Sequence, residues 1–112
     1  MVGDADVPLL ARACTPCTGE TPRVSERREH EWLRQLPGWR VTAGKLTKTF
    51  RRADFLDAMR FVNRVAELAE REAHHPDFFV SYARVDFSLS THAIQALSEN
   101  DFVLAAKIDA LA

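Results

Sequence analysis

The sequence predicts a single α+β domain, in which a four-stranded antiparallel sheet has helices packed on one face. The length of 112 residues and the apolar fraction of 46% suit one ordinary globular domain. Four short segments alternate apolar and polar residues, as half-buried strands do. Helical patterns lie before, between and after the two strand pairs. The order helix, two strands, helix, two strands, helix therefore places helices on one face of an antiparallel sheet.

Residues 1–24 precede this pattern and show no periodicity. We expect them to form a flexible N-terminal leader, followed by a single domain over residues 25–112. The leader carries Cys14 and Cys17 as a lone C-x-x-C pair. A structural zinc site needs four ligands, and the chain has no second cysteine pair. We therefore expect reduced thiols without a function of their own.

Composition and charge exclude several classes of protein. The net charge of -1 argues against nucleic acid as the main partner, because phosphate binding needs a basic surplus. No apolar run approaches the roughly 18 residues of a membrane span. The first residues contain acids where a signal peptide needs bases. We expect a cytoplasmic protein with no nucleic-acid or membrane partner.

The first helix and the first strand pair have clear boundary signals. Ser25 is a good N-cap for a short charged helix, which Pro37 and Gly38 end. Two alternating strands follow, joined by a tight turn at Gly44. The alternating residues of these strands are Trp39, Val41 and Ala43, then Leu46, Lys48 and Phe50.

A long helix is predicted from Asp54 to His74, with Asp54 as its cap. Proline disfavours the helical region for the residue before it, so Pro76 should end this helix near His74 and leave His75 extended. The helix has a broad apolar stripe and a charged opposite face. The stripe comprises Phe55, Met59, Val62, Ala66 and Ala69, widened by Ala58, Phe61, Val65 and Leu68. The charged face comprises Arg60, Arg64, Glu67 and Arg71.

Two more strands and a last helix complete the chain. The strands alternate through Phe78, Val80 and Tyr82, then Val85, Phe87 and Leu89. Ser98 and Asp101 have the spacing of a capping box, which starts a helix from Asp101 to Ala112. This helix is apolar around most of its circumference, and one small sheet does not cover it all. We therefore expect an oligomer, a homodimer or a homotetramer.

Three of the four histidines are His74, His75 and His92. The first two stand at the junction between the long helix and the third strand. The antiparallel return of the fourth strand should bring His92 back beside them. Imidazoles titrate near neutral pH, so three of them at one place suggest a site that moves protons.

Several spaced elements together resemble the signature of the pterin-4a-carbinolamine dehydratases, also called 4a-hydroxytetrahydrobiopterin dehydratases. These elements are Glu70-x-x-x-His74-His75-Pro76, Tyr82, Ser90-Thr91-His92 and Leu97-Ser98-Glu99-x-Asp101. The likeness extends from about Trp32 to Ala112. It implies dehydration of 4a-hydroxytetrahydrobiopterin to quinonoid dihydropterin, a step of tetrahydrobiopterin recycling. It implies no metal or other cofactor, and a pathway shared with an aromatic amino acid hydroxylase.

The resemblance also implies roles for individual residues. His74, His75 and His92 correspond to the catalytic histidines of the family, and which is the acid and which is the base stays open. Among the substrate-binding positions, Glu70 is expected to orient His74, and Asp101 to bind or orient. The polar edge of the pterin would meet Ser90 and Thr91.

Two other hypotheses remain. Some relatives of this family act as binding or assembly factors, for example in RuBisCO assembly, and this chain would then be catalytically idle. A metal site from His74, His75, His92 and Asp101 is the second. Adjacent histidines do not readily face one ion, and neither H-x-H nor H-x-x-x-H spacing occurs.

Overall fold

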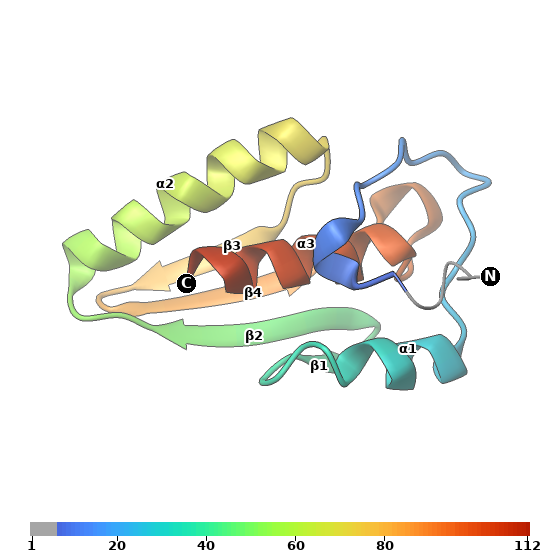
Figure 1. Cartoon of the computed structure of the whole chain (residues 1–112). Coiled ribbons are helices and arrows are strands. Elements are labelled where there is room, and N and C mark those ends of the chain that lie inside the picture. The colour runs from blue at the N-terminus through green and yellow to red at the C-terminus, as the bar shows by residue number, and fades with distance from the viewer. Residues whose placement is uncertain (1–6) are drawn as a thin grey trace.

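The computed structural model describes residues 7–112 as a four-stranded antiparallel sheet with three α-helices (Figure 1). The strands run in the order β1-β2-β4-β3. They are β1 (Arg40–Thr42), β2 (Lys45–Arg51), β3 (Asp77–Ser81) and β4 (Arg84–Leu89). The helices are α1 (Glu26–Leu33), α2 (Phe55–Glu72) and α3 (Glu99–Leu111), with short 3-10 turns η2 (Leu9–Ala11) and η3 (His92–Ile94). The predicted fold class and the predicted order of elements are confirmed.

Two hairpins form the sheet, and each turns at residues with a left-handed backbone. The first turn uses Ala43 and Gly44, with φ of 52° and 75°. The second uses Tyr82, with φ of 53°, so Tyr82 lies in the turn and not in the strand where we expected it. The central pair β2 and β4 joins the hairpins. Alternation along these strands points one set of side chains at the helices: Leu46, Phe50, Val85, Phe87 and Leu89.

Helix α2 begins where the sequence indicated and ends earlier. The side chain of Asp54 accepts a hydrogen bond from the backbone N–H of Asp57 at 2.7 Å, as a helix cap does. At the other end Ala73 is left-handed, with φ of 53°, and the helix stops at Glu72. The backbone N–H of His74 then donates to the carbonyl of Ala69, which closes the last turn. The predicted end at His74 was therefore two residues too late.

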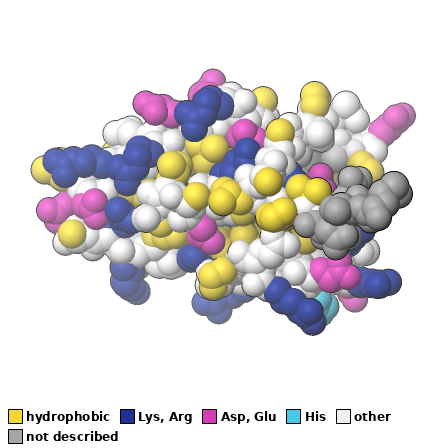
Figure 2. All heavy atoms as spheres, in the orientation of Figure 1, with side chains coloured by type: hydrophobic (Ala, Val, Ile, Leu, Met, Phe, Trp, Pro, Cys, Tyr) yellow, Lys and Arg dark blue, Asp and Glu magenta, His cyan; other side chains and the backbone are white. Residues whose placement is uncertain are grey.

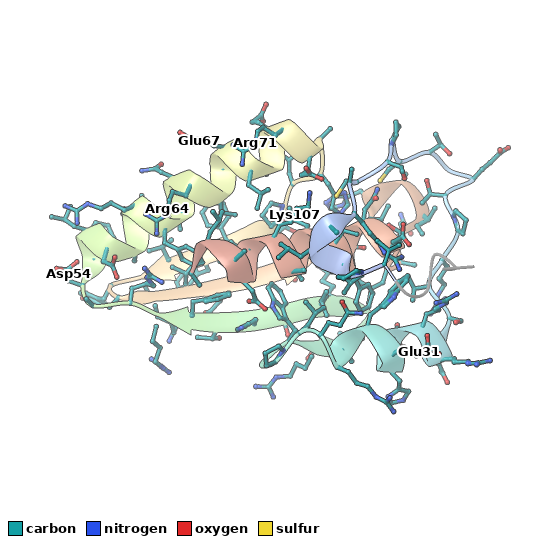
Figure 3. All side chains as sticks on the ribbon, in the orientation of Figure 1. Glu31, Asp54, Arg64, Glu67, Arg71 and Lys107 are labelled. Carbon is teal, nitrogen blue, oxygen red and sulfur yellow. The ribbon has the colours of Figure 1, made fainter. Side chains whose placement is uncertain are left out.

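The buried stripe of α2 is narrower than predicted. It comprises Ala58, Phe61, Val62, Val65, Leu68 and Ala69. Phe55 is 53% exposed and Ala66 is also exposed, although both were placed in the stripe. At 100° per residue, Ala66 lies about 90° from the line between Phe61 and Val62. Phe55 lies about as far from that line as the buried Leu68, and is exposed in the first turn of the helix. The charged face agrees with the prediction, because Arg60, Arg64, Glu67 and Arg71 are all exposed. Figure 3 shows Glu67 on the outer side of α2, whereas the guanidinium of Arg64 reaches the carbonyl of Leu111 at the end of α3.

Helix α3 forms the centre of the core. Most of its apolar residues are fully buried: Phe102, Val103, Leu104, Ala105 and Ile108 have no exposed surface. The covering surfaces come from the same chain: α2 packs on one side, and η2 with its fully buried Leu9 packs on another. The ring of Trp32 in α1 lies 5.3 Å from that of Phe102. The apolar circumference of α3 therefore requires no second subunit, contrary to our reason for expecting an oligomer.

The described part of the N-terminal segment packs against the domain. Leu9 is fully buried, and its backbone N–H donates to Oε1 of Gln35 at 3.0 Å. Closer to α1, the N–H of Val24 donates to the carbonyl of Leu97 at 2.9 Å. Figure 1 shows this segment in blue, running past the start of α3. Residues 7–24 thus contribute to the folded unit, unlike the flexible leader we expected, and residues 1–6 lie outside the described part.

The surface mixes charges of both signs. Figure 2 shows hydrophobic side chains near the centre of one face, with basic and acidic side chains dispersed around them. Within residues 7–112, no helix has the length and apolar character needed to cross a membrane.

Candidate active site

A cavity of about 250 Å³ opens where the end of α2, the start of β3 and the end of β4 meet. All three of the histidines singled out in the sequence line it, together with Ser90 and Thr91. Neither Glu70 nor Asp101 lines it. The full lining is Cys17, Ala73, His74, His75, Pro76, Asp77, Ser90, Thr91, His92 and Ala93.

The hairpin register explains why distant residues meet here. Asp77 pairs with Ser88, so the residues before β3 and the residues after β4 emerge at the same end of the hairpin. His74 and His75 precede Asp77, and His92 follows the end of β4 in η3. An antiparallel hairpin thereby brings the two sequence segments to one cavity.

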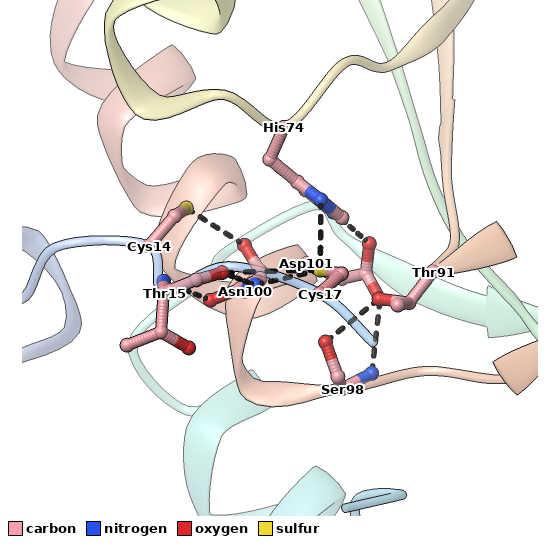
Figure 4. Close-up of polar contacts among 8 residues, drawn as sticks. All are labelled: Cys14, Thr15, Cys17, His74, Thr91, Ser98, Asn100 and Asp101. Atoms are coloured by element: carbon pink, nitrogen blue, oxygen red, sulfur yellow. Dashed lines mark hydrogen bonds and ion pairs between the residues drawn. The ribbon is translucent and has the colours of Figure 1, made fainter. Parts of the chain in front are cut away.

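His74 belongs to a buried polar cluster at the first turn of α3 (Figure 4). Its Nε2 lies 2.6 Å from Oδ1 of Asp101, a residue with no exposed surface. The other carboxylate oxygen, Oδ2, accepts from the hydroxyl of Thr91 at 2.8 Å and from the backbone N–H of Ser98 at 3.0 Å. The last contact belongs to the capping box that the sequence predicted. The carboxylate therefore caps a helix and holds an imidazole at the same time.

These contacts fix the orientation of His74. An ionised carboxylate only accepts hydrogen bonds, so Nε2 of His74 carries a proton when Asp101 is ionised. The positive end of the helix dipole favours that negative charge at the first turn of α3. In the neutral ring, the remaining nitrogen, Nδ1, is then the acceptor. It faces the Sγ of Cys17 at 3.8 Å.

His75 has a different environment. Its Nε2 lies 2.8 Å from Oε1 of Glu70, and the two side chains are 61% and 79% exposed. We had expected Glu70 to orient His74. The left-handed Ala73 turns His74 inward to Asp101, and leaves His75 on the side of Glu70. Exposed pairs of this kind contribute little to stability.

Burial also revises the expected substrate contacts. Asp101 has no exposed surface, and it meets the lining of the cavity through His74 and Thr91, which both contact its carboxylate. The hydroxyl of Thr91 is engaged with Asp101 and with Ser98, at 2.8 Å and 2.7 Å. Thr91 thus lines the cavity with its hydroxyl directed into the protein, whereas Ser90 is half-buried at the lining.

The sequence did not predict a place for Cys17 in the cavity. Its sulfur contacts Nδ1 of His74 and accepts from Nδ2 of Asn100 at 3.0 Å. Asn100 also exchanges two hydrogen bonds with the backbone of Thr15, at 2.9 Å and 2.7 Å, and so fixes the segment that carries the thiol. The C-x-x-C pattern was the only local signal, and it does not identify partners so distant in the sequence.

The surroundings of Cys14 favour a protonated thiol. Burial raises the pKa of its thiol to about 12, and the charge of Glu72 adds to this effect. Glu72 in turn accepts from the backbone N–H of Cys14 at 2.9 Å, which is the largest cause of its lowered pKa. Nζ of Lys107 forms an ion pair with Oε2 of Glu72 at 3.1 Å, which also lowers the pKa of Glu72. Lys107 lies between α3 and α2 (Figure 3). This cluster is structural in character.

No metal centre is evident at this site. Within the part of the chain that the structure describes, there is no group of three or more His, Cys, Asp or Glu side chains that could hold an ion. The metal-site hypothesis gains no support from the coordinates.

A larger hollow, of about 560 Å³, lies on the open face of the sheet. Its charged lining comes from Arg40, Lys48, Asp77 and Asp86, and no histidine lines it. It therefore lacks the side chain that transfers protons most readily at neutral pH. The smaller cavity is the better candidate for acid–base chemistry.

Comparison with known proteins identifies the family. A family model described as "Pterin 4 alpha carbinolamine dehydratase" matches residues 22–111. The chain belongs to the pterin-4a-carbinolamine dehydratase family. Members of this family that are named for their activity are hydro-lyases, so the chain belongs to a family of enzymes.

Several bacterial relatives named pterin-4-alpha-carbinolamine dehydratase are similar over nearly their whole length. One from Stenotrophomonas maltophilia is 45% identical over 107 residues, which cover 94% of this chain and 92% of the relative. One from Xanthomonas oryzae is 48% identical and covers 90% and 87%. Since residues 22–112 make up only about four-fifths of the chain, these alignments extend into the N-terminal segment.

A solved structure supports the fold assignment. The crystal structure described as a transcriptional coactivator/pterin dehydratase from Brucella melitensis has a TM-score of 0.78 and 36% sequence identity to this chain. It covers 81% of this chain and 99% of the Brucella chain. The α+β architecture of the dehydratase family is thus shared.

Proposed function

We propose that this protein dehydrates a 4a-hydroxytetrahydropterin, a pterin-4a-carbinolamine, to the quinonoid dihydropterin. The bond between C4a and its hydroxyl oxygen breaks, and water leaves. The hydroxyl is a poor leaving group until it is protonated, and a ring nitrogen loses a proton as the new double bond forms. One general acid and one general base that titrate near neutral pH meet these requirements without a cofactor.

The observation that carries this proposal is the single cavity lined by His74, His75 and His92 in a member of this family. Its volume of about 250 Å³ suits the flat bicyclic head of a pterin with its side chain toward solvent. Pro76 and Ala93 supply apolar contact, and Ser90 supplies a polar group for the ring edge.

The three imidazoles would have different roles in proton transfer, because their surroundings differ. His74 is buried and held by Asp101, so its ring stays in one orientation through the reaction. His75 and His92 are exposed at the cavity, where they exchange protons with solvent between turnovers. A fixed imidazole on one side and exchangeable imidazoles on the other provide both proton transfers.

The decisive experiment follows decay of a freshly generated carbinolamine by stopped-flow absorbance. We expect the protein to accelerate the decay well above buffer alone. His92→Ala should lower the rate by about 100-fold, the usual contribution of a general acid or base. The matched control is His30→Ala, which removes an exposed histidine of α1 outside the cavity and should leave the rate unchanged.

Two outcomes would refute this assignment. Wild-type protein that is no faster than buffer would favour a catalytically idle binding or assembly factor. Equal rates for wild type and His92→Ala would remove His92 from the mechanism. Thermal unfolding of each variant establishes that a lost rate does not reflect a lost fold.

We also propose that the chain assembles into a homodimer or homotetramer through surfaces other than α3. The outer edge of β3 pairs with no strand among the described residues, and it carries Phe79, which is 59% exposed. Phe55 and Leu56 of α2 are 53% and 62% exposed. Light scattering after gel filtration measures the mass, and a monomer at micromolar concentration would contradict this proposal.

A further inference from the structure

Cys17 is the one thiol in the described lining of the cavity, and it lies beside an imidazole. Its Sγ lies 3.8 Å from Nδ1 of His74, whose Nε2 lies 2.6 Å from the buried carboxylate of Asp101. Sulfur, imidazole and carboxylate thus form one continuous array (Figure 4). A nucleophile, its base and a third group that orients the base are the recurring parts of covalent catalytic sites.

We propose that Cys17 and His74 form a reactive thiol–imidazole pair in the wall of this cavity, at which small neutral electrophiles and hydrogen peroxide add to the sulfur. The thiol is half-buried, so small reagents reach it. Asn100 donates to the sulfur at 3.0 Å, and an N–H donor stabilises a thiolate more than a thiol. The imidazole can take the thiol proton, and the amide N–H can donate to the sulfur.

The other cysteine of the same motif provides an internal contrast. Cys14 stands three residues away, and its pKa is raised to about 12 by burial and by the charge of Glu72. Its sulfur lies 3.6 Å from the carbonyl oxygen of Asn100, and that of Cys17 lies 3.9 Å from the carbonyl oxygen of Thr15, so the imidazole of His74 is what distinguishes the two thiols. Only the thiolate is nucleophilic, so Cys14 should be inert at pH 7.

The proposed chemistry balances without any further group. With iodoacetamide, a bond forms between sulfur and the methylene carbon, the carbon–iodine bond breaks, iodide leaves, and the thiol proton passes to Nδ1 of His74. With hydrogen peroxide, a sulfur–oxygen bond forms, the oxygen–oxygen bond breaks, water leaves, and the product is a sulfenic acid. Sulfur is oxidised and the peroxide is reduced.

Modification should also stop the proposed dehydration, and this part of the inference rests on the proposed function. A group added to Cys17 occupies space that Ser90 and His92 also line. The titratable groups around the pair come from every neighbouring element. They are Asp101 of α3, His92 of η3, His75 and Asp77 before and in β3, and Cys14 with Glu72.

The test measures alkylation of each cysteine by iodoacetamide at pH 7, with peptide mass spectrometry as the readout. We expect Cys17 to react at least about tenfold faster than Cys14, because a thiol whose pKa is raised to about 12 is almost fully protonated at pH 7. His74→Gln should slow Cys17 about tenfold. His30→Ala, which removes an exposed histidine of α1 outside the cavity, is the matched control and should leave the alkylation of Cys17 unchanged. Circular dichroism confirms that each variant is folded.

Equal alkylation rates for Cys17 in wild type and in folded His74→Gln would overturn the pair, as would a Cys14 that reacts faster than Cys17. A slow Cys17 in a protein that dehydrates the carbinolamine refutes this inference and leaves the function standing. A fast Cys17 in a protein without dehydratase activity supports the reactive pair and refutes the proposed function. For the linked inhibition, Cys14→Ala protein should lose its activity on alkylation, whereas Cys17→Ala protein should keep its activity.

Discussion

His74 and His75 are neighbours in the sequence and have opposite environments in the structure. The side chain of His74 is 8% exposed and meets a carboxylate with no exposure at all. The side chain of His75 is 61% exposed and meets a carboxylate that is 79% exposed. The left-handed Ala73 before them separates the two side chains, so one faces α3 and the other faces solvent.

This difference shows that removal of two neighbouring histidines of one site can change the free energy of unfolding by different amounts. The partner of His74 also binds Thr91 and Ser98, so the loss of this imidazole disturbs a whole buried network. The carboxylate of Glu70, the partner of His75, makes no other hydrogen bond or ion pair among the described residues. Stability measurements should therefore separate the two histidines, even where activity measurements do not.

Removal of Asp101 should have the largest effect. Asp101→Ala leaves the ring of His74, the hydroxyl of Thr91 and the N–H of Ser98 without their acceptor in a buried place. We expect a loss of about 3 kcal/mol in the free energy of unfolding. Urea denaturation followed by circular dichroism measures it. Glu67→Ala on the exposed face of α2 is the control, and an equal loss in both variants would contradict the role of the buried carboxylate.

The histidine pair gives the next largest effect. His74→Ala should destabilise the fold by about 2 kcal/mol, because it leaves a buried carboxylate oxygen unpaired. His75→Ala should change the free energy of unfolding by less than about 0.5 kcal/mol, as exposed substitutions do. Parallel urea titrations compare them. If His75→Ala proved the more damaging, the contrast between the two environments would be wrong.

An acid titration tests the cluster around Glu72. Its pKa is lowered in the folded protein, chiefly by the N–H of Cys14. The stabilisation is therefore complete above the ordinary pKa of about 4.5 and is lost as the pH falls through the lower folded value. The melting temperatures of wild type and Glu72→Gln should differ by a constant amount at pH 6 to 8 and converge in acid. A difference that grows in acid would contradict the sign of this shift.

Glu70 should give the smallest effect. Glu70→Gln retains a hydrogen-bonding oxygen beside His75 and removes an exposed charge. We expect the free energy of unfolding to change by less than about 0.5 kcal/mol. The dehydration rate should fall by no more than about threefold. A loss as large as that of His92→Ala would give Glu70 a direct role, which its absence from the cavity lining argues against.

Local signals in the sequence predicted most of the fold. The caps at Ser25 and Asp54 and the capping box of Ser98 and Asp101 all occur in the structure, because each depends on residues within four positions of one another. The alternation of the strands was equally local. The end of α2 was predicted too late because Ala73 adopts a left-handed backbone, which alanine seldom does. An alanine side chain gives no sequence signal for such a conformation.

The site was predicted less completely than the fold. The three histidines reach one cavity because the hairpin register is simple. Asp101 was given a role in binding or orienting, and only its burial separates the two. Cys17 and Leu9 were missed because the segment that carries them has no periodicity, and its contacts join it to α3, Gln35 and His74 far along the chain.

The carboxylate of Asp101 belongs both to the start of α3 and to the candidate site. The same group starts a helix that is central to the hydrophobic interior and sets the angle of an imidazole. When the amino end of α3 frays, His74 loses its anchor in the same event. Heating should accordingly abolish turnover in step with the melting of this helix, and a partly unravelled protein should have no residual activity.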